Sequence, residues 1–154
     1  MVKNHENGLQ AQLVVHPNKN LADKEVVAFD RTITQSGSDI CLMPNGKIKI
    51  CSAGLFLVNW NISVAGTDTK PFARFAITVN NKIHGASARP TAVGELYSSN
   101  LVAVARSPCE IALVNDTGDI VQLSKISPIA NITIVQITKS NSTRRCGLCQ
   151  LLFN

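Results

Sequence analysis

The chain has 154 residues, of which 45% are hydrophobic and 16% charged, so it holds enough apolar material for one domain with a real core. Its net charge of +5 is not gathered in a basic run with aromatic residues, and no apolar run is long enough to cross a bilayer. Neither nucleic-acid binding nor membrane insertion is therefore expected. Residues 1–10 are polar and are predicted to form a flexible N-terminal arm.

From residue 11 onward, short apolar runs alternate with turn-forming clusters, and no stretch keeps a helical period. Short strands at this spacing are typical of a β-sandwich or barrel. The sequence predicts an all-β domain over residues 11–138, followed by a tail over 139–154. Its strands are expected at 26–29, 40–43, 47–51, 55–64, 72–80, 101–105, 110–114, 120–123 and 132–137.

The run 55–64 has the clearest strand pattern. Phe56, Val58 and Trp60 fall on one face, while the opposite face begins with Leu55 and Leu57 and then becomes polar. A strand that is apolar on both faces needs a second cover, which can be another sheet, a terminal arm or another subunit. The run 132–137 also looks buried on both faces. We therefore expect a core and subunit interface built from Leu55, Leu57, Trp60, Ile132 and Ile134.

The five cysteines leave at least one without a partner in the chain. Residues 40–51 read as a hairpin around Asn45-Gly46. A three-residue loop over 45–47 places Leu42 opposite Ile50, and it then places Cys41 opposite Cys51. Opposed positions can approach disulfide distance. A Cys41–Cys51 disulfide and two unlinked thiols are equally compatible with this pattern.

The tail ends in an apolar segment that contains a Cys-x-x-Cys pair. Two cysteines would need two more ligands to hold zinc, so a disulfide or plain thiols are the simpler interpretation. The segment either folds back over its own domain or docks into a neighbouring molecule and links copies into a filament. Candidate residues for a link between subunits are Cys109, Cys146, Cys149, Leu151, Leu152 and Phe153.

Catalysis has little support in the sequence. The three histidines, His5, His16 and His84, belong to no nucleophile, metal or acid–base motif. We expect no enzyme activity, no cofactor and no metal site.

Several of these runs resemble a known family. The run from Gly54 to Ser63 is similar to the Gly-x-Tyr-x-Val-x-Trp strand in the bacterial branch of the complement-globular-head and tumour-necrosis-factor-like proteins, with Phe56 at the Tyr position. The run from Ala73 to Asn81 resembles that family's Phe-Ala-Leu-x-Val-Asn-Gly hairpin. Later runs follow the order of its last strands, at 101–104, 111–118, 121–123 and 130–137.

This resemblance covers about residues 24–138. It implies a ten-strand jelly roll packed as a homotrimer, with both termini at one end, as in the head domains of exosporium collagen-like proteins. The chain has no Gly-x-y repeat, so the expectation is confined to the trimeric head.

The resulting functional prediction is a structural or assembly protein of the bacterial cell or spore surface that can link into filaments through its termini. Its partner is a second copy of itself. The first residues are not followed by an apolar segment, so we expect synthesis in the cytoplasm and no cleaved signal peptide. The alternative is a trimeric head that binds an unknown surface ligand or receptor without catalysis.

Overall fold

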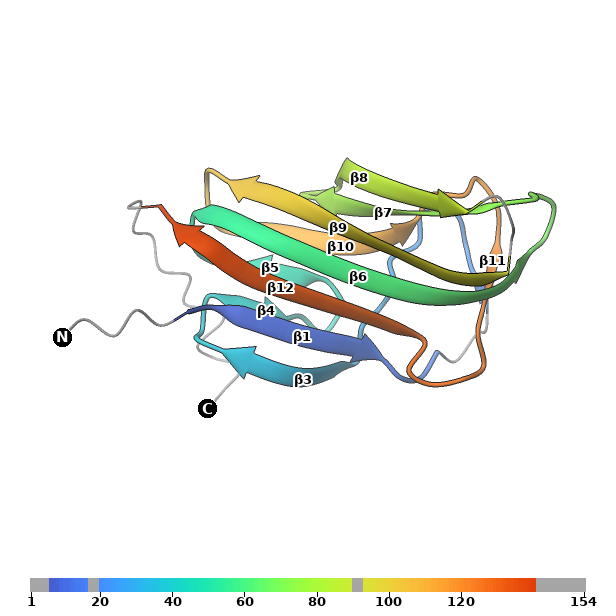
Figure 1. The fold of residues 1–154 in the computed structure, drawn as a ribbon, viewed down its shortest axis with the longest axis horizontal. Helices are drawn as coiled ribbons and strands as arrows, with labels where there is room; N and C mark the ends of the chain where they lie inside the picture. The colour runs from blue at the N-terminus through green and yellow to red at the C-terminus, as the bar shows by residue number, and fades with distance from the viewer. Residues whose placement is uncertain (1–5, 17–19, 90–92, 141–154) are drawn as a thin grey trace.

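Alternation of buried and exposed side chains organises the chain into strands. The computed structural model describes residues 6–16, 20–89 and 93–140 (Figure 1). These residues form twelve strands. They are β1 (Gly8–Leu13), β2 (Asn20–Leu21), β3 (Arg31–Ser36), β4 (Ile40–Leu42), β5 (Ile48–Ile50), β6 (Gly54–Thr67), β7 (Ala73–Val79), β8 (Lys82–Arg89), β9 (Gly94–Val104), β10 (Cys109–Asn115), β11 (Val121–Leu123) and β12 (Ala130–Lys139).

The strands form two sheets that pack face to face. The seven-stranded sheet has the order β2-β11-β6-β12-β1-β3, with β9 paired to β6. The five-stranded sheet has the order β4-β5-β10-β7-β8. In Figure 1 the long strands β9, β6, β12 and β1 lie in front, and the smaller sheet lies behind them. Neighbours far apart in sequence, such as β1 and β12, give the crossed connectivity of a jelly roll.

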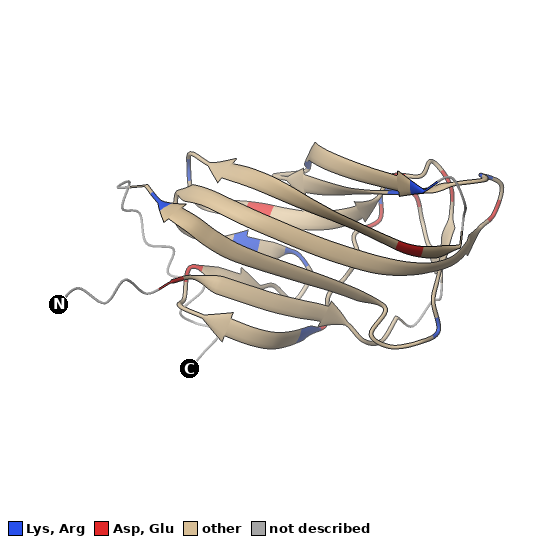
Figure 2. Cartoon of the chain, in the orientation of Figure 1, with Lys and Arg blue, Asp and Glu red and all other residues tan. Residues whose placement is uncertain are grey.

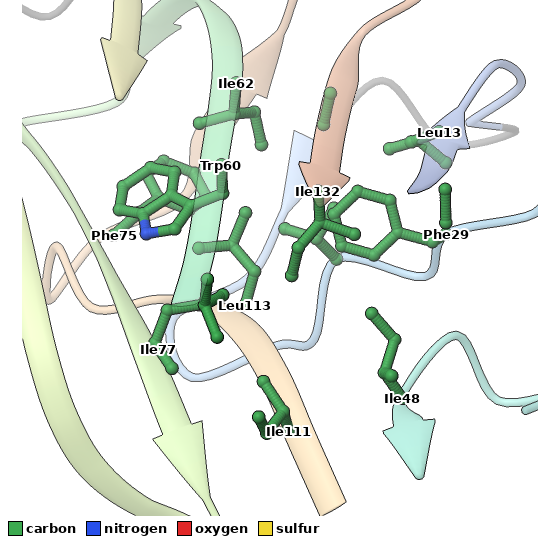
Figure 3. Close-up of a cluster of buried hydrophobic side chains, with 14 of the residues drawn as sticks. Leu13, Phe29, Ile48, Trp60, Ile62, Phe75, Ile77, Ile111, Leu113 and Ile132 are labelled. Atoms are coloured by element: carbon green, nitrogen blue, oxygen red, sulfur yellow. The ribbon is translucent and has the colours of Figure 1, made fainter. Parts of the chain in front are cut away.

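Aliphatic and aromatic side chains fill the space between the sheets. From the large sheet come Trp60, Ile62 and Ile132, and from the small sheet come Phe75 and Leu113, all with at most 3% of their surface exposed (Figure 3). The single tryptophan thus lies in the core, as the pattern of the 55–64 run predicts. Burial of side chains of this size stabilises a fold by roughly 1.5–3 kcal/mol each.

The Asn80–Asn81 pair makes the turn between β7 and β8. Asn80 and Asn81 have φ values of 49° and 66°, a conformation that asparagine tolerates better than most residues. Two such residues form the tight hairpin whose twist matches the flanking strands. The hairpin that the resemblance implies at the end of the run from Ala73 to Asn81 is therefore confirmed.

Two segments and the number of strands differ from the sequence prediction. Residues 8–10, expected in a flexible arm, belong to β1, which pairs with both β12 and β3. The expected strand 26–29 is instead an irregular segment that touches β10 through one bridge, Val26 to Val114. The resemblance implied ten strands, whereas the structure adds short or edge strands such as β2 and β3 to reach twelve.

Candidate functional site

The outward face of the large sheet is the most distinctive surface in the described part of the molecule. Along β6, Phe56, Val58 and Trp60 point into the core, so the intervening residues point away from it. Leu55 and Leu57 are half-buried on this outward face, and Asn59 is exposed. The face is therefore apolar at the start of β6 and polar toward its middle, as the sequence predicts.

One row of aliphatic side chains crosses three strands of this face. Leu57 lies opposite Leu101 on β9 and opposite Val135 on β12. Leu101 is 57% exposed and Val135 is 42% exposed. The neighbouring register positions add Leu55 opposite Ala103. We call Leu57, Leu101 and Val135 the aliphatic row.

The next rows are polar but uncharged. Ser99 Oγ donates to Asn59 Oδ1 at 2.6 Å. One row further, Gln12 Nε2 donates to Asn131 Oδ1 at 2.7 Å, and Asn131 Nδ2 donates to Asn61 Oδ1 at 2.9 Å. These amides satisfy much of one another's hydrogen-bonding capacity across β1, β12 and β6. A partner that covers them therefore leaves fewer polar groups unpaired.

Charge is almost absent from the centre of the face. Residues 54–66 of β6, 130–138 of β12 and 8–13 of β1 include no Lys, Arg, Asp or Glu. In Figure 2 the coloured segments on the front sheet lie mainly near strand ends, with Glu95 on β9. An uncharged face loses little solvation free energy on contact, so it suits burial against another molecule.

A polar cluster ties the beginning of β1 to the end of β12. Asn7 is 4% exposed, and its Nδ2 donates to Gln136 Oε1 at 2.8 Å and to Asp39 Oδ2 at 3.1 Å. Gln136 Nε2 donates in turn to Ser52 Oγ at 3.2 Å. Lys139 Nζ lies 3.4 Å from Asp39 Oδ2. These five residues, the terminal cluster, hold the beginning and the end of the domain together at one end of the sandwich (Figure 1).

The structure separates the residues expected at the interface into two groups. Leu55 and Leu57 lie on the outward face. Trp60, Ile132 and Ile134 are 3%, 1% and 0% exposed and belong to the core between the sheets. Leu101 and Val135 also lie on the outward face and were not predicted there, although each occupies the outward position of an alternating strand.

The predicted register of the β4–β5 hairpin is wrong. Ile40 lies opposite Ile50, which places Cys41 opposite Lys49 rather than Cys51. Met43 and Lys47 close the turn, so the loop is Pro44-Asn45-Gly46. Gly46 has φ of 80°, and a Cβ there would lie 2.2 Å from Ala28 Cα. This loop conformation therefore requires glycine at position 46. Cys41 and Cys51 lie in one small buried cluster with Met43, without the opposition on which the disulfide prediction depended.

Cys109, a candidate for linking subunits, is buried in the main core at 3% exposure. Desolvation, and then the neighbouring Glu110, raise the pKa of its thiol to about 11. A buried, protonated thiol is a poor nucleophile for disulfide exchange, which argues against the predicted role. The other candidates, Cys146, Cys149, Leu151, Leu152 and Phe153, lie outside the described residues.

The described residues offer little to other chemistry. Over 6–16, 20–89 and 93–140, no group of three or more His, Cys, Asp or Glu side chains is placed to hold a metal ion. No helix within these ranges is long and apolar enough to cross a membrane.

Comparison with known proteins gives a result for the fold alone. No family model and no curated protein sequence matches the chain. Among solved structures, murine APRIL at pH 5.0 matches with a TM-score of 0.66 and 12% identity, over 86% of this chain and 99% of that one. Eiger TNF from S. frugiperda matches with a TM-score of 0.63 and 13% identity, over 93% and 99%. The globular domain of zebrafish complement 1qA matches with a TM-score of 0.64 and 9% identity, over 88% and 99%.

These likenesses extend over most of the chain and almost all of each matched structure. The chain therefore has the all-β jelly-roll fold seen in these tumour-necrosis-factor-like and complement-head structures. At such low identity the likeness concerns architecture and assigns no ligand or activity to the chain.

Proposed function

We propose that the protein is a non-catalytic homotrimer that serves as a structural unit of a surface assembly, and that its subunits meet through the outward face of β9, β6, β12 and β1. The observation that carries this proposal is the exposed aliphatic row on a face whose centre lacks charge. A contiguous apolar patch that stays exposed to water promotes aggregation of a monomer, whereas an obligate oligomer buries such a patch in its interface.

The composition of the face supports self-association over recognition of a charged partner. Leu57, Leu101 and Val135 offer apolar area, and the amides of Asn61 and Asn131 are already paired with each other. Threefold packing comes from the resemblance to complement-head and tumour-necrosis-factor-like domains. Three copies that contact through one surface patch and its neighbour form a closed ring, so association stops at the trimer.

We assign the trimer to the surface of a bacterial cell or spore, where it acts as an assembly component made in the cytoplasm. This assignment follows the sequence resemblance to exosporium head domains. Linking of trimers through the chain termini is part of the same proposal. It is supported by the terminal cluster, which puts the beginning of β1 and the end of β12 side by side. Immunogold labelling of intact and sectioned spores tests the location, and label confined to the cytosol would contradict it.

A ligand- or receptor-binding head is the alternative function. Tyr97, 75% exposed at the edge of the outward face, is the observation that favours it, because exposed tyrosines are common in binding sites. The burial of Trp60 weighs against a binding function, since the only tryptophan of the sequence lies in the core and cannot contact a ligand. If Tyr97→Ala leaves trimer formation intact but abolishes labelling of a cell surface by the purified protein, the binding function would replace the structural one.

The interface is tested by placing a charge in the aliphatic row. Leu101→Asp and Val135→Asp each put a carboxylate where the proposal needs a dry contact, and both side chains are exposed enough for the monomer to fold. We expect multi-angle light scattering to show a trimer for the wild type and a folded monomer for each variant. Ile126→Asp is the matched control, because Ile126 is 80% exposed in a loop away from the row.

A wild-type chain that is a stable monomer at micromolar concentration would overturn the proposal. So would an unchanged trimer in both row variants. Circular dichroism of each variant separates loss of association from loss of folding.

A further inference from the structure

Cys41 is buried although it lies on the outer face of the small sheet. The preceding residue of β4, Ile40, is buried in the core between the two sheets, so the Cys41 side chain points to the opposite face of the strand. The exposed fraction of Cys41 is nevertheless 0%. Cys51 and Met43 are the described residues that form a buried cluster with it. A side chain on the outer face of a two-layer sandwich becomes inaccessible to water only when another part of the chain covers it.

Cys41 takes part in a disulfide bond. Cys51 and Cys109 keep their thiols, so neither of them is its partner. The sequence contains five cysteines, and the other two are Cys146 and Cys149, which lie outside the described residues. Within the chain, the disulfide of Cys41 can therefore be made only with the Cys-x-x-Cys pair.

The last described residues bring the chain close to Cys41. Lys139 Nζ lies 3.4 Å from Oδ2 of Asp39, which is two positions before Cys41. The Ser140 N–H donates to the carbonyl of Ala53, which follows β5, the strand that pairs with β4. Figure 1 shows the end of β12 and the start of β4 at the same end of the sandwich. The chain therefore leaves β12 beside the cluster that contains Cys41.

The Cys-x-x-Cys pair lies within reach of this cluster. Cys146 follows Ser140 by six residues and Cys149 follows it by nine. An extended chain spans about 3.3–3.6 Å per residue, so these segments reach roughly 20 Å and 30 Å from Ser140. Closure of so short a loop costs little entropy. A cysteine of the same chain therefore meets Cys41 at a much higher effective concentration than a cysteine of another copy.

We propose that Cys41 forms its disulfide with Cys146 or Cys149 of its own chain, and that this bond anchors the C-terminal segment against β4. The apolar residues within 146–153 then supply the cover over the outer face of the small sheet. When the bond forms, the two thiols lose two protons and two electrons, and a small-molecule disulfide accepts the electrons and becomes two thiols. The inference goes beyond the proposed function, because it concerns contacts within one chain, and it leaves one cysteine of the pair for a link between trimers.

The anchored strand has few other connections. β4 is the outermost strand of the small sheet and has only three residues, so few backbone pairs hold it in place. A bond from position 41 to position 146 or 149 closes a loop of more than 100 residues. In the chain-entropy model, a cross-link over so long a loop destabilises the unfolded chain strongly. Reduction should therefore release the segment and lower the thermal stability of the domain.

Peptide mapping identifies the bond. The full chain is oxidised with a small-molecule disulfide, its remaining thiols are blocked, and it is digested with trypsin without reduction. Cleavage after Lys and Arg separates Cys41, Cys51 and the Cys-x-x-Cys pair onto three different peptides. We expect the Cys41 peptide to be linked to the peptide of Cys146 and Cys149. A Cys41–Cys51 bond, a Cys146–Cys149 bond or a Cys41 thiol in the oxidised protein would overturn the proposal.

Thermal unfolding with and without a reducing agent measures the effect of the anchor. We expect reduction to lower the Tm of the wild type by roughly 5 °C or more. The Tm of Cys41→Ser, and that of the double variant Cys146→Ser, Cys149→Ser, should not respond to reduction. Cys109→Ala is the matched control, because it removes a buried cysteine that keeps its thiol and should respond as the wild type does. Each variant is compared with its own reduced form, so destabilisation by the substitution itself does not enter the comparison.

Two further outcomes separate this inference from the proposed function. A non-reducing denaturing gel shows whether the bond of Cys41 lies within one chain or between chains. If Cys41 joins two copies, the anchor within the chain is wrong, while linking of trimers through the termini gains support. If the bond lies within one chain and light scattering shows a stable monomer, the trimer proposal fails and the anchor stands.

Discussion

Asp119 connects two loops at the end of the sandwich away from the terminal cluster. Its Oδ2 accepts hydrogen bonds from the Thr69 N–H at 2.6 Å and the Lys70 N–H at 3.0 Å, and its Oδ1 accepts from the Ile120 N–H at 2.8 Å. The hydrogen bond from the Thr69 backbone is the largest cause that lowers the pKa of this carboxyl below its usual value of 3.8. The Asp119 carboxylate therefore serves the fold, by joining the loop before β7 to the loop before β11.

Replacement of that carboxylate should change how stability depends on pH. Because the folded-state pKa of Asp119 is lowered, its contribution is present above the ordinary carboxyl pKa and is lost as pH falls through the folded value. We expect Asp119→Asn to lower Tm at pH 7, and the difference from wild type to shrink below about pH 4. Scanning calorimetry across this range checks the prediction. Asp68→Asn is the control, because the Asp68 side chain accepts no hydrogen bond from the described residues; an equal loss in that variant would contradict the assignment.

At the scale of single elements, glycines form tight turns between strands at points where a side chain would clash with a neighbouring segment. Gly37 has φ of 71° at the start of the β3–β4 loop, and a Cβ there would lie 2.0 Å from Asn7 Oδ1. Gly46 plays the corresponding part in the β4–β5 hairpin, against the backbone of residues 28 and 29. A loop held this tightly sets the register of a three-residue strand such as β4, which has too few pairs to set it alone.

Substitution at Gly46 should destabilise the whole domain. Gly46→Ala combines a positive φ with a clash against the Ala28 backbone, and we expect a loss of roughly 2 kcal/mol or more in the free energy of unfolding. Gly66→Ala is the matched control, because its Cβ would approach only the flexible end of Gln122, at 3.4 Å, and its φ is ordinary. Urea unfolding at one fixed protein concentration measures both variants. Equal stability of the two would show that the loop adapts.

At the scale of the whole molecule, the uncharged centre of the outward face predicts how association responds to salt. Subunits joined by aliphatic and amide contacts have few ion pairs to screen. We therefore expect the trimer dissociation constant to stay nearly constant, or to fall, between about 0.1 M and about 1 M salt, over which the screening length shortens from roughly 10 Å to 3 Å. Sedimentation equilibrium measures this directly. A trimer that weakens steeply with salt would place the interface on a charged surface instead.

The alternation along β6 was enough to predict its two faces, the burial of Trp60 and the need to cover Leu55 and Leu57. The turn at Asn80–Asn81 was predictable for a similar reason, since asparagine is among the few residues that accept its backbone geometry. These features depend on neighbours within a few positions of the chain, where the sequence carries the relevant chemistry.

Other features depend on contacts that the sequence does not contain. The segment 26–29 has the apolar composition of a strand, but it meets β10 only around Val26 and Val114, because β5 occupies the preceding part of that edge of β10, at residues 109–111. The aliphatic row of Leu57, Leu101 and Val135 appears only when β9, β6 and β12 are brought into register. Alternation thus determined which side chains share a face. Only the tertiary structure decided which face the second sheet covers, because coverage follows from packing between segments far apart in the chain.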